Sequence, residues 1–234
     1  MAEKDVVELE LYLIRHGQSV TNAATEEQIN AMDYNMREDP ALSEKGVYQA
    51  QKLGERFENI DLNAVFSSCL NRAVLTAKGI LDRQKDAKPL YVNPVFSEVH
   101  LPSYYRGSSI EELERLCANV TPCHHADFSG GLIEGDENDT DEIIQKRAAR
   151  AVNMIRSEFK NGEKVAVVSH AGFITHMAFY LLGFIENLPD DIDISFNNAS
   201  VTRIVFYKKG THSFGSTVFR NVNDTAHLDG EYIT

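Results

Sequence analysis

The segment "LYLIRHGQSVTN", residues 11–22, ends an apolar run on Arg15 and His16 and continues with Gly17. Residues 6–14 first alternate and then become fully apolar, which is typical of a strand that enters a protein core. A charged pair and a glycine turn at the end of such a strand indicate that the strand tip carries a function. The remainder of the chain must then supply the partners of this pair.

Strand and helix patterns alternate along the chain. Apolar strand patterns occupy residues 62–68, 164–170, 199–210 and 216–224, and residues 88–99 have an extended pattern. Helical periodicity occupies residues 42–57, 70–83 and 136–163, and a more apolar helix pattern runs from Gly172 to Leu182. This alternation predicts an α/β, three-layer sandwich with a mostly parallel central sheet flanked by helices.

The helix predicted over residues 42–57 has both an N-cap residue and an apolar face. Ser43 is a suitable N-cap residue, because its hydroxyl can accept a hydrogen bond from the first turn. The spacing of Val47, Ala50, Leu53 and Phe57 predicts one inner face that packs against the sheet.

The length of 234 residues is compatible with a single domain over 1–234. Two segments, at about 23–41 and 100–137, lack clear periodicity and are expected to be irregular. Long irregular segments in a compact domain are commonly lids or binding loops. We therefore expect substrate specificity to depend on these two segments.

Composition narrows the function and the setting. The net charge of −12 disfavours binding to nucleic acid or to an anionic membrane surface. Three cysteines without metal-type spacing imply no disulfide framework, and residues 1–10 lack the features of a signal peptide. A cytoplasmic protein without a membrane span is expected. An anionic ligand would have to be attracted by a local cluster of cations.

Five chemically competent side chains follow predicted strands. They belong to Arg15, His16, Arg72, Glu98 and His170. Because ligands of open α/β sheets bind beyond the carboxyl ends of the strands, we expect these groups to lie together. Arginine forks and helix N-termini suit a phosphoryl group. A phosphate ester is the predicted ligand class.

Several blocks of the chain, taken in order, resemble one known family. They are "LIRHGQSVTN", "LSEKGVYQAQKLGERF", "VFSSCLNRAVLTA", "VVSHAGFI", "NNASVTRI" and "NVNDTAHL". Together they resemble the histidine phosphatase superfamily, also called the phosphoglycerate mutase-like family, over nearly the whole chain. The three residues Arg-His-Gly alone would be a weak match, but the combination with "SSxLxRAxxTA" and "SHAG" is specific.

The resemblance implies a role for each motif residue. His16 would be the nucleophile and would form a phosphohistidine. Arg15, Arg72 and His170 would hold the transferring phosphoryl group and balance its charge. Such chemistry suits an imidazole, because it offers a neutral nitrogen near working pH.

The remaining implied roles concern proton transfer and neutral donors. Glu98 would protonate the leaving oxygen and then take a proton from water. Asn22 and the backbone amide of Ala171 would donate hydrogen bonds to the substrate. No metal ion and no other cofactor is expected, because the cations belong to the chain itself.

Other phosphate chemistries fit the sequence less well. "GGLIEGD", residues 130–136, has Asp136 where a nucleotide-binding P-loop needs lysine. None of the cysteines has the arginine six residues later that a cysteine phosphatase needs. "DIDIS", residues 191–195, resembles the motif of magnesium-dependent phosphatases but lacks a preceding apolar strand. "CHHADF", residues 123–128, has no second ligand pair at metal spacing and is expected to be a lid loop.

Within the family, the choice lies between phosphatase and mutase. The resemblance implies that phosphoglycerate mutases carry additional arginines and a lysine in the insert after the acid. In this chain the insert, residues 99–132, holds only Arg106 and Arg115, which are not adjacent, and no lysine. We therefore expect a phosphoric monoester hydrolase of the histidine acid phosphatase type. Mutase-type transfer and a non-catalytic member that binds phosphorylated ligands are the alternatives.

The substrate is expected to be a small phosphorylated molecule, with a phosphoprotein as an alternative. Tyr104, Tyr105, Arg106, His124 and His125 are the insert residues for which a substrate contact stays open. The sequence pattern leaves a homodimer open as well.

Overall fold

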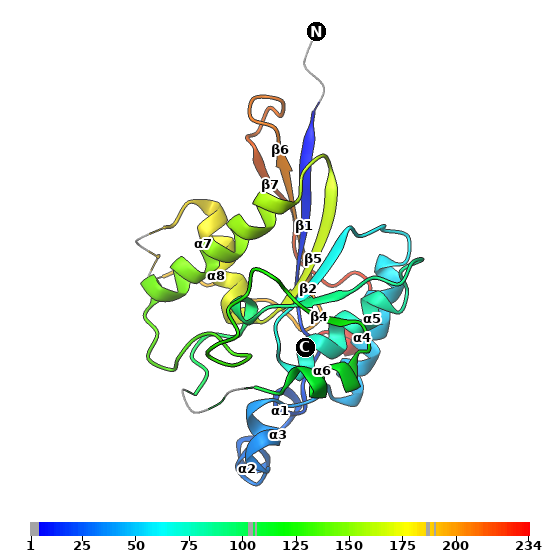
Figure 1. Ribbon diagram of the computed structural model, residues 1–234, viewed down its shortest axis with the longest axis vertical. Helices are drawn as coiled ribbons and strands as arrows, with labels where there is room; N and C mark the ends of the chain where they lie inside the picture. The colour runs from blue at the N-terminus through cyan, green and yellow to red at the C-terminus, as the bar shows by residue number, and fades with distance from the viewer. Residues whose placement is uncertain (1–4, 103–104, 106, 186–187, 190) are drawn as a thin grey trace.

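The computed structural model describes residues 5–102, 105, 107–185, 188–189 and 191–234. Its centre is a seven-stranded sheet with the order β4-β3-β2-β5-β1-β6-β7 (Figure 1). The pairs from β4 to β1 are parallel, whereas β6 and β7 join antiparallel at one edge. The strands are β1 (Val7–Arg15), β2 (Ala64–Ser67), β3 (Leu90–Val92), β4 (Val120–Pro122), β5 (Glu163–Ser169), β6 (Val201–Tyr207) and β7 (Thr217–Asp224).

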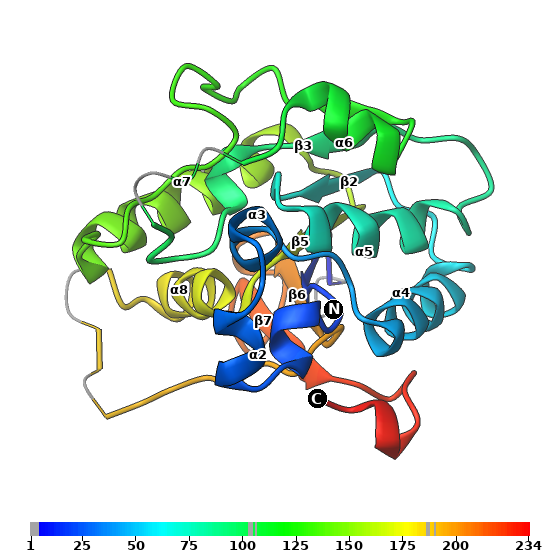
Figure 2. The same cartoon turned by 90° about the horizontal axis from the view of Figure 1, so that it is seen from below.

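Two pairs of helices cover the two faces of the sheet. Helices α4 (Glu44–Phe57) and α5 (Asn71–Leu81) lie on one face, and α7 (Asp141–Glu158) and α8 (Ala171–Leu182) lie on the other (Figure 2). The predicted three-layer α/β sandwich with a mostly parallel sheet is therefore confirmed. Successive side chains of a strand point to opposite faces of the sheet, so one strand contributes to the core on both faces. In β1, Tyr12 and Ile14 pack toward the α4 and α5 layer, whereas Leu11 and Leu13 pack toward α7 and α8.

The parallel register of β1 and β5 fixes the position of the predicted motifs. Arg15 lies opposite Ser169, and the backbone N–H of His16 donates to the carbonyl of Ser169 at 2.9 Å. His16 and His170 therefore leave adjacent strands at the same edge. The short helices α1 (Val20–Ala23), α2 (Glu26–Asn30) and α3 (Tyr34–Glu38) lie beyond this edge (Figures 1 and 2).

The prediction that 23–41 and 100–137 are irregular is wrong in part. The first segment contains α2 and α3, and the second contains α6 (Ile110–Leu116) and β4. Thr25 caps α2 and Ser109 caps α6, each in a reciprocal capping box. These helices are too short to display a full amphipathic period, so their signal was the cap rather than the apolar pattern.

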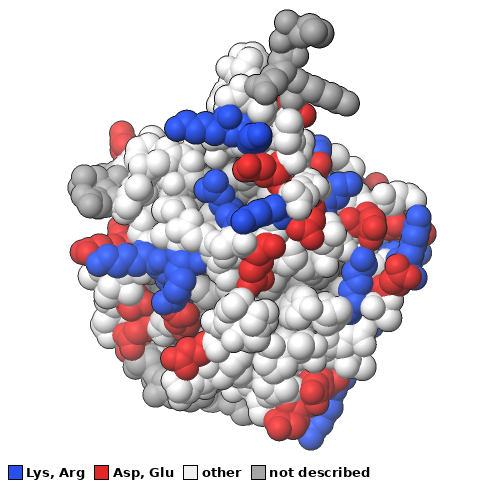
Figure 3. All heavy atoms as spheres, turned by 45° about the horizontal axis from the view of Figure 1, so that its top comes forward, with Lys and Arg blue, Asp and Glu red and all other residues white. Residues whose placement is uncertain are grey.

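The charges on the surface and the apolar content of the helices bear on the expectations from composition. On the face shown in Figure 3, Lys and Arg side chains are interspersed with Asp and Glu side chains. Among the described residues, none of the helices combines the length and the apolar composition that a membrane crossing requires.

Helix α4 begins after Ser43, whose hydroxyl accepts from the backbone N–H of Gly46 at 3.1 Å, as predicted. The predicted inner face is correct for Ala50, Leu53 and Phe57 but wrong for Val47, which is 47% exposed. The buried face begins instead at Gly46, where α4 approaches the segment after β1. A Cβ atom on Gly46 would lie 2.0 Å from the carbonyl oxygen of Gln18.

We expect Gly46→Ala to destabilise the protein by roughly 1–3 kcal/mol, because the new methyl group meets rigid backbone. Thermal unfolding of the variant measures this effect. Gly130→Ala is the matched control, since a Cβ atom there has no neighbour within 4 Å among the described residues. Equal melting temperatures for the two variants would contradict the close approach.

Candidate active site

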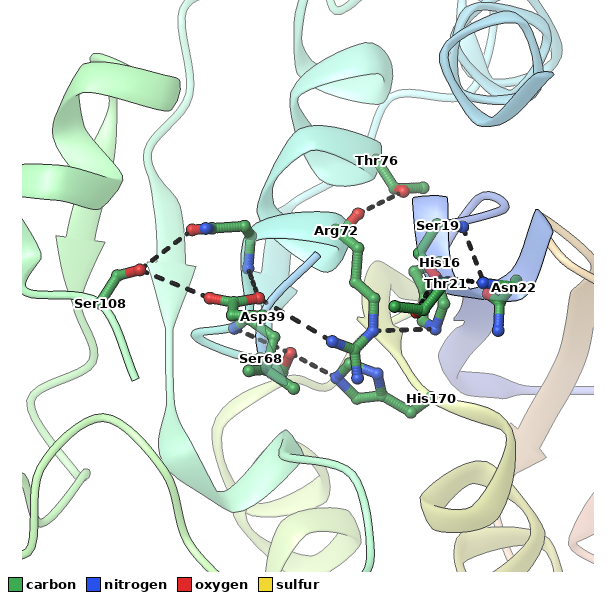
Figure 4. A network of polar contacts seen from close by, with 12 residues as sticks. His16, Ser19, Thr21, Asn22, Asp39, Ser68, Arg72, Thr76, Ser108 and His170 are labelled. Atoms are coloured by element: carbon green, nitrogen blue, oxygen red, sulfur yellow. Dashed lines mark hydrogen bonds and ion pairs between the residues drawn. The ribbon is translucent and has the colours of Figure 1, made fainter. Parts of the chain in front are cut away.

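A cavity of about 230 Å³ opens at the carboxyl edge of β1 and β5. Its walls come from the segment after β1, from α1, α3 and α5, and from the segment after β3. Five of the predicted site residues line it: Arg15, His16, Asn22, Arg72 and Glu98. The topology thus brings together side chains that are far apart in the sequence, as Figure 4 shows for His16, Asn22 and Arg72.

The imidazole of His16 is buried and held in one orientation. Its Nδ1 lies 2.7 Å from the carbonyl oxygen of Gly17, which can only accept, so Nδ1 carries the proton. Nε2 is therefore unprotonated, and its lone pair accepts from Nε of Arg72 at 3.2 Å. Burial, followed by the charge of Arg72, holds the pKa of His16 well below its usual value of 6.5. The ring is therefore neutral at working pH.

Arg72 occupies the first turn of α5, where its side chain is almost fully buried. Thr76 ties this turn to the segment after β1, because its hydroxyl donates to the carbonyl of Arg72 at 2.7 Å and accepts from the backbone N–H of Gly17 at 2.9 Å. One hydroxyl thus fixes the relative position of the two segments that carry the nucleophile candidate and its neighbouring cation.

Arg15 completes the cationic side of the cavity. Its Nη1 donates to the carbonyl of Phe196 at 2.6 Å, which anchors the guanidinium against the loop before β6. Burial lowers the pKa of Arg15, but arginine keeps its proton because its pKa starts far above neutrality. The charge is therefore permanent.

His170 is the N-cap residue of α8 and is fully buried. Its ring centroid lies 5.0 Å from that of His16. Its Nε2 lies 2.7 Å from Oγ of Ser68, which also accepts from the backbone N–H of Leu70 at 3.3 Å. The Ser68 hydroxyl can donate its proton to Nε2, which leaves the ring proton on Nδ1. Among the described residues this Nδ1 has no hydrogen-bond partner.

Glu98 lies on the far side of the cavity, held by the N-terminus of α8. Its Oε1 accepts from the backbone N–H groups of Val99 at 2.9 Å and Phe173 at 3.1 Å. Arg147 of α7 supports the same turn, because its Nη2 donates to the carbonyl of Glu98 at 3.3 Å. A Cβ atom on Gly172 would lie 2.6 Å from Val99 Cγ2 and 2.9 Å from Glu98 Oε1, so glycine leaves room for the carboxylate.

The two predicted neutral donors occupy different positions. Asn22 lies in α1 at the rim of the cavity, and its Oδ1 accepts from the backbone N–H of Ser19 at 3.2 Å. Ala171 is the first residue of α8, so its backbone N–H has no intrahelical partner. It is not among the residues that line the cavity.

Comparisons with known proteins identify the family. The family model of the histidine phosphatase superfamily (branch 1) matches residues 11–215. The chain belongs to this superfamily. A relative from Yersinia pestis (strain Pestoides F), named as the probable phosphoglycerate mutase GpmB, is 27% identical over 229 residues and covers 94% of this chain and 95% of its own.

Two solved structures have the same fold over nearly the whole of this chain. Phosphoserine phosphatase from Entamoeba histolytica superposes with a TM-score of 0.59 at 21% identity, over 94% of this chain and 99% of its own. The structure named mycobacterial hydrolase 2 gives a TM-score of 0.64 at 19% identity, over 97% and 94%. At these identities the likeness shows the fold alone.

Sequence reasoning missed part of this cavity and of its surroundings. The additional cavity-lining residues are Ser19, Thr21, Arg37, Pro40 and Leu101. Ser68 and Thr76 lie within the "SSxLxRAxxTA" block, so their position in that motif was an available signal. Asp39 is buried beside Arg72, with Oδ1 3.8 Å from Nη1. Nothing in the local pattern distinguished it from the other acids of its segment.

The insert residues differ in their placement. Tyr104 and Arg106 lie outside the described residues, whereas Tyr105 is buried and donates to Asp39. His124 and His125 are exposed and are not among the cavity-lining residues. Their ring nitrogens and a carboxylate oxygen of Glu158 lie within 4.8 Å of one another.

We expect Ser68→Ala to lower kcat roughly tenfold, because the loss of one buried hydrogen bond frees the His170 ring to change tautomer. Steady-state kinetics with an aryl phosphate measures the effect. Ser157→Ala removes a hydroxyl from the exposed face of α7, where it bonds only a local carbonyl, and is the matched control. Equal kcat values for the two variants would contradict the role of Ser68.

Proposed function

We propose that this protein is a metal-independent phosphomonoester hydrolase that acts through a phosphohistidine on His16. One observation carries the proposal: the buried, neutral His16 ring has its Nδ1 proton bound to the Gly17 carbonyl and directs its Nε2 toward Arg72. An unprotonated imidazole nitrogen beside a fixed cation suits attack on a phosphoryl group.

The first chemical step would use five groups of the site. The Nε2 lone pair of His16 forms the N–P bond while the P–O bond of the ester breaks. Arg15, Arg72 and the Nδ1 proton of His170 stabilise the charge on the equatorial oxygens. The carboxyl group of Glu98 gives its proton to the leaving oxygen.

In the second step Glu98, now ionised, takes a proton from water, and the resulting hydroxide displaces His16 from phosphorus. Orthophosphate leaves, and both His16 and Glu98 return to their starting protonation states. The helix N-terminus that holds Oε1 of Glu98 orients the carboxylate in both steps.

Water is favoured over a second substrate as the phosphoryl acceptor. Of the two insert arginines, Arg115 is exposed on α6 and is not among the cavity-lining residues, and Arg106 lies outside the described residues. The named relatives nevertheless support mutase-type transfer as a second candidate. The cavity volume of about 230 Å³ favours a small phosphorylated substrate.

We expect hydrolysis of an aryl phosphate to persist in excess chelator, since the cations of the site are side chains. His16→Ala should lower kcat by on the order of 10³-fold or more, because no other group replaces the nucleophile. Acid quenching of the wild-type protein with labelled substrate should trap acid-labile phosphate on the chain. His124→Ala, an exposed histidine outside the cavity, is the control and should keep full activity.

Other results of these experiments would favour a different candidate function or overturn the mechanism. Orthophosphate binding without turnover would favour a phosphate-ligand sensor. Transfer of the label to a phosphoglycerate, rather than to water, would favour a mutase. Undiminished turnover by His16→Ala would overturn the phosphohistidine mechanism.

A further inference from the structure

Asp39 is an acid that the proposed reaction does not use, yet it lies directly behind the phosphoryl site. It follows α3 and is only 6% exposed. Its Oδ1 accepts from the backbone N–H of Asn71 at 2.8 Å and lies 3.8 Å from Nη1 of Arg72. Figure 4 shows the carboxylate on one side of the Arg72 guanidinium and the His16 ring on the other.

The hydrogen bond to Asn71 gives Asp39 a capping function for α5. Leu70, the N-cap residue of α5, has no side chain that can accept from the first turn. The Asp39 carboxylate takes this role from a distant segment and lies at the positive end of the helix dipole. The same helical turn carries Arg72, so one carboxylate fixes both the backbone and the guanidinium of that turn.

The insert reaches the same carboxylate from the opposite side. The hydroxyl of Tyr105 donates to Asp39, and Oγ of Ser108 lies 3.4 Å from Oδ2. Asp39 thus joins α3, α5 and the insert at one buried point. Arg72, Tyr105 and the buried thiol of Cys69 are the titratable groups that face it from these elements.

We propose that Asp39 is a positioning residue for phosphoryl transfer, which holds the Arg72 guanidinium beside His16, where it can stabilise the transferring phosphoryl group. The proposal rests on the function proposed above. Without the carboxylate, Arg72 would follow a bound phosphate in the ground state rather than stay aligned for the transferring group. Ground-state binding would then improve while the transition state loses stabilisation.

The charge on Asp39 opposes folding. Burial raises its pKa to about 6, from a usual value of 3.8, and the attraction to Arg72 offsets only part of this shift. The folded state therefore holds the proton more tightly than the unfolded chain does. The stability associated with this proton is complete only well below the usual value of 3.8 and is lost as the pH rises through about 6.

The test compares Asp39→Asn with the wild-type protein. Asparagine keeps an oxygen for the Asn71 N–H group, and the Tyr105 hydroxyl can rotate to accept from its amide. We expect kcat to fall roughly tenfold and orthophosphate to bind roughly three- to tenfold more tightly at about pH 8, because one nearby negative charge is gone. The difference in orthophosphate binding should vanish near pH 4, where Asp39 is protonated in the folded wild-type protein.

Melting temperatures distinguish positioning from a structural role. Asp39→Asn should melt at or above the wild-type temperature at about pH 8, and at the wild-type temperature well below pH 3.8, where Asp39 is protonated in both the folded and the unfolded state. Asp82→Asn, at the exposed C-cap of the same helix, is the control and should alter neither kinetics nor orthophosphate binding.

Each remaining outcome has a defined meaning. An Asp39→Asn variant that fails to fold, or that loses activity only in proportion to its stability, would overturn the proposal. So would unchanged kcat together with unchanged orthophosphate affinity. If the wild-type protein hydrolyses no phosphomonoester, the proposed function fails; the orthophosphate and melting comparisons still decide whether Asp39 controls Arg72.

Discussion

The site depends on the parallel pairing of β1 with β5. Because Arg15 lies opposite Ser169, the two residues that follow, His16 and His170, leave the sheet side by side. A register shift of one residue would turn one of these side chains toward the opposite face of the sheet. The alternating burial of β1 between two helical layers fixes this register, so the core determines the spacing of the two imidazole rings.

Burial shifts the pKa values of three ionisable side chains in or beside the cavity. Removal from water favours the neutral form of an ionisable side chain, and it lowers the pKa values of His16 and His170 while it raises that of Asp39. Arginine alone keeps its charge under these conditions. The site thus combines permanent cations with the neutral imidazoles of His16 and His170.

The sequence predicted the features that depend on a single element. Strand-end positions identified Arg15, His16 and His170, and the cap at Ser43 located the start of α4. The sequence was a poor guide to the exposure and contacts of a residue where a segment distant in the chain packs against it. Val47 is exposed because the close approach at Gly46 sets the buried face of α4, and Asp39 acts through Asn71 and Arg72, which its own segment does not contain. The short helices α2 and α3 were missed because one or two turns show no apolar period.

The two carboxylates of the site contribute differently to Arg72. Burial lowers the pKa of this guanidinium, and the charges of Asp39 and then Glu98 oppose that change from two sides. Glu98 lines the cavity, whereas Asp39 is enclosed behind α5 and the insert. An enclosed acid can orient a cation throughout a reaction cycle without taking part in proton transfer.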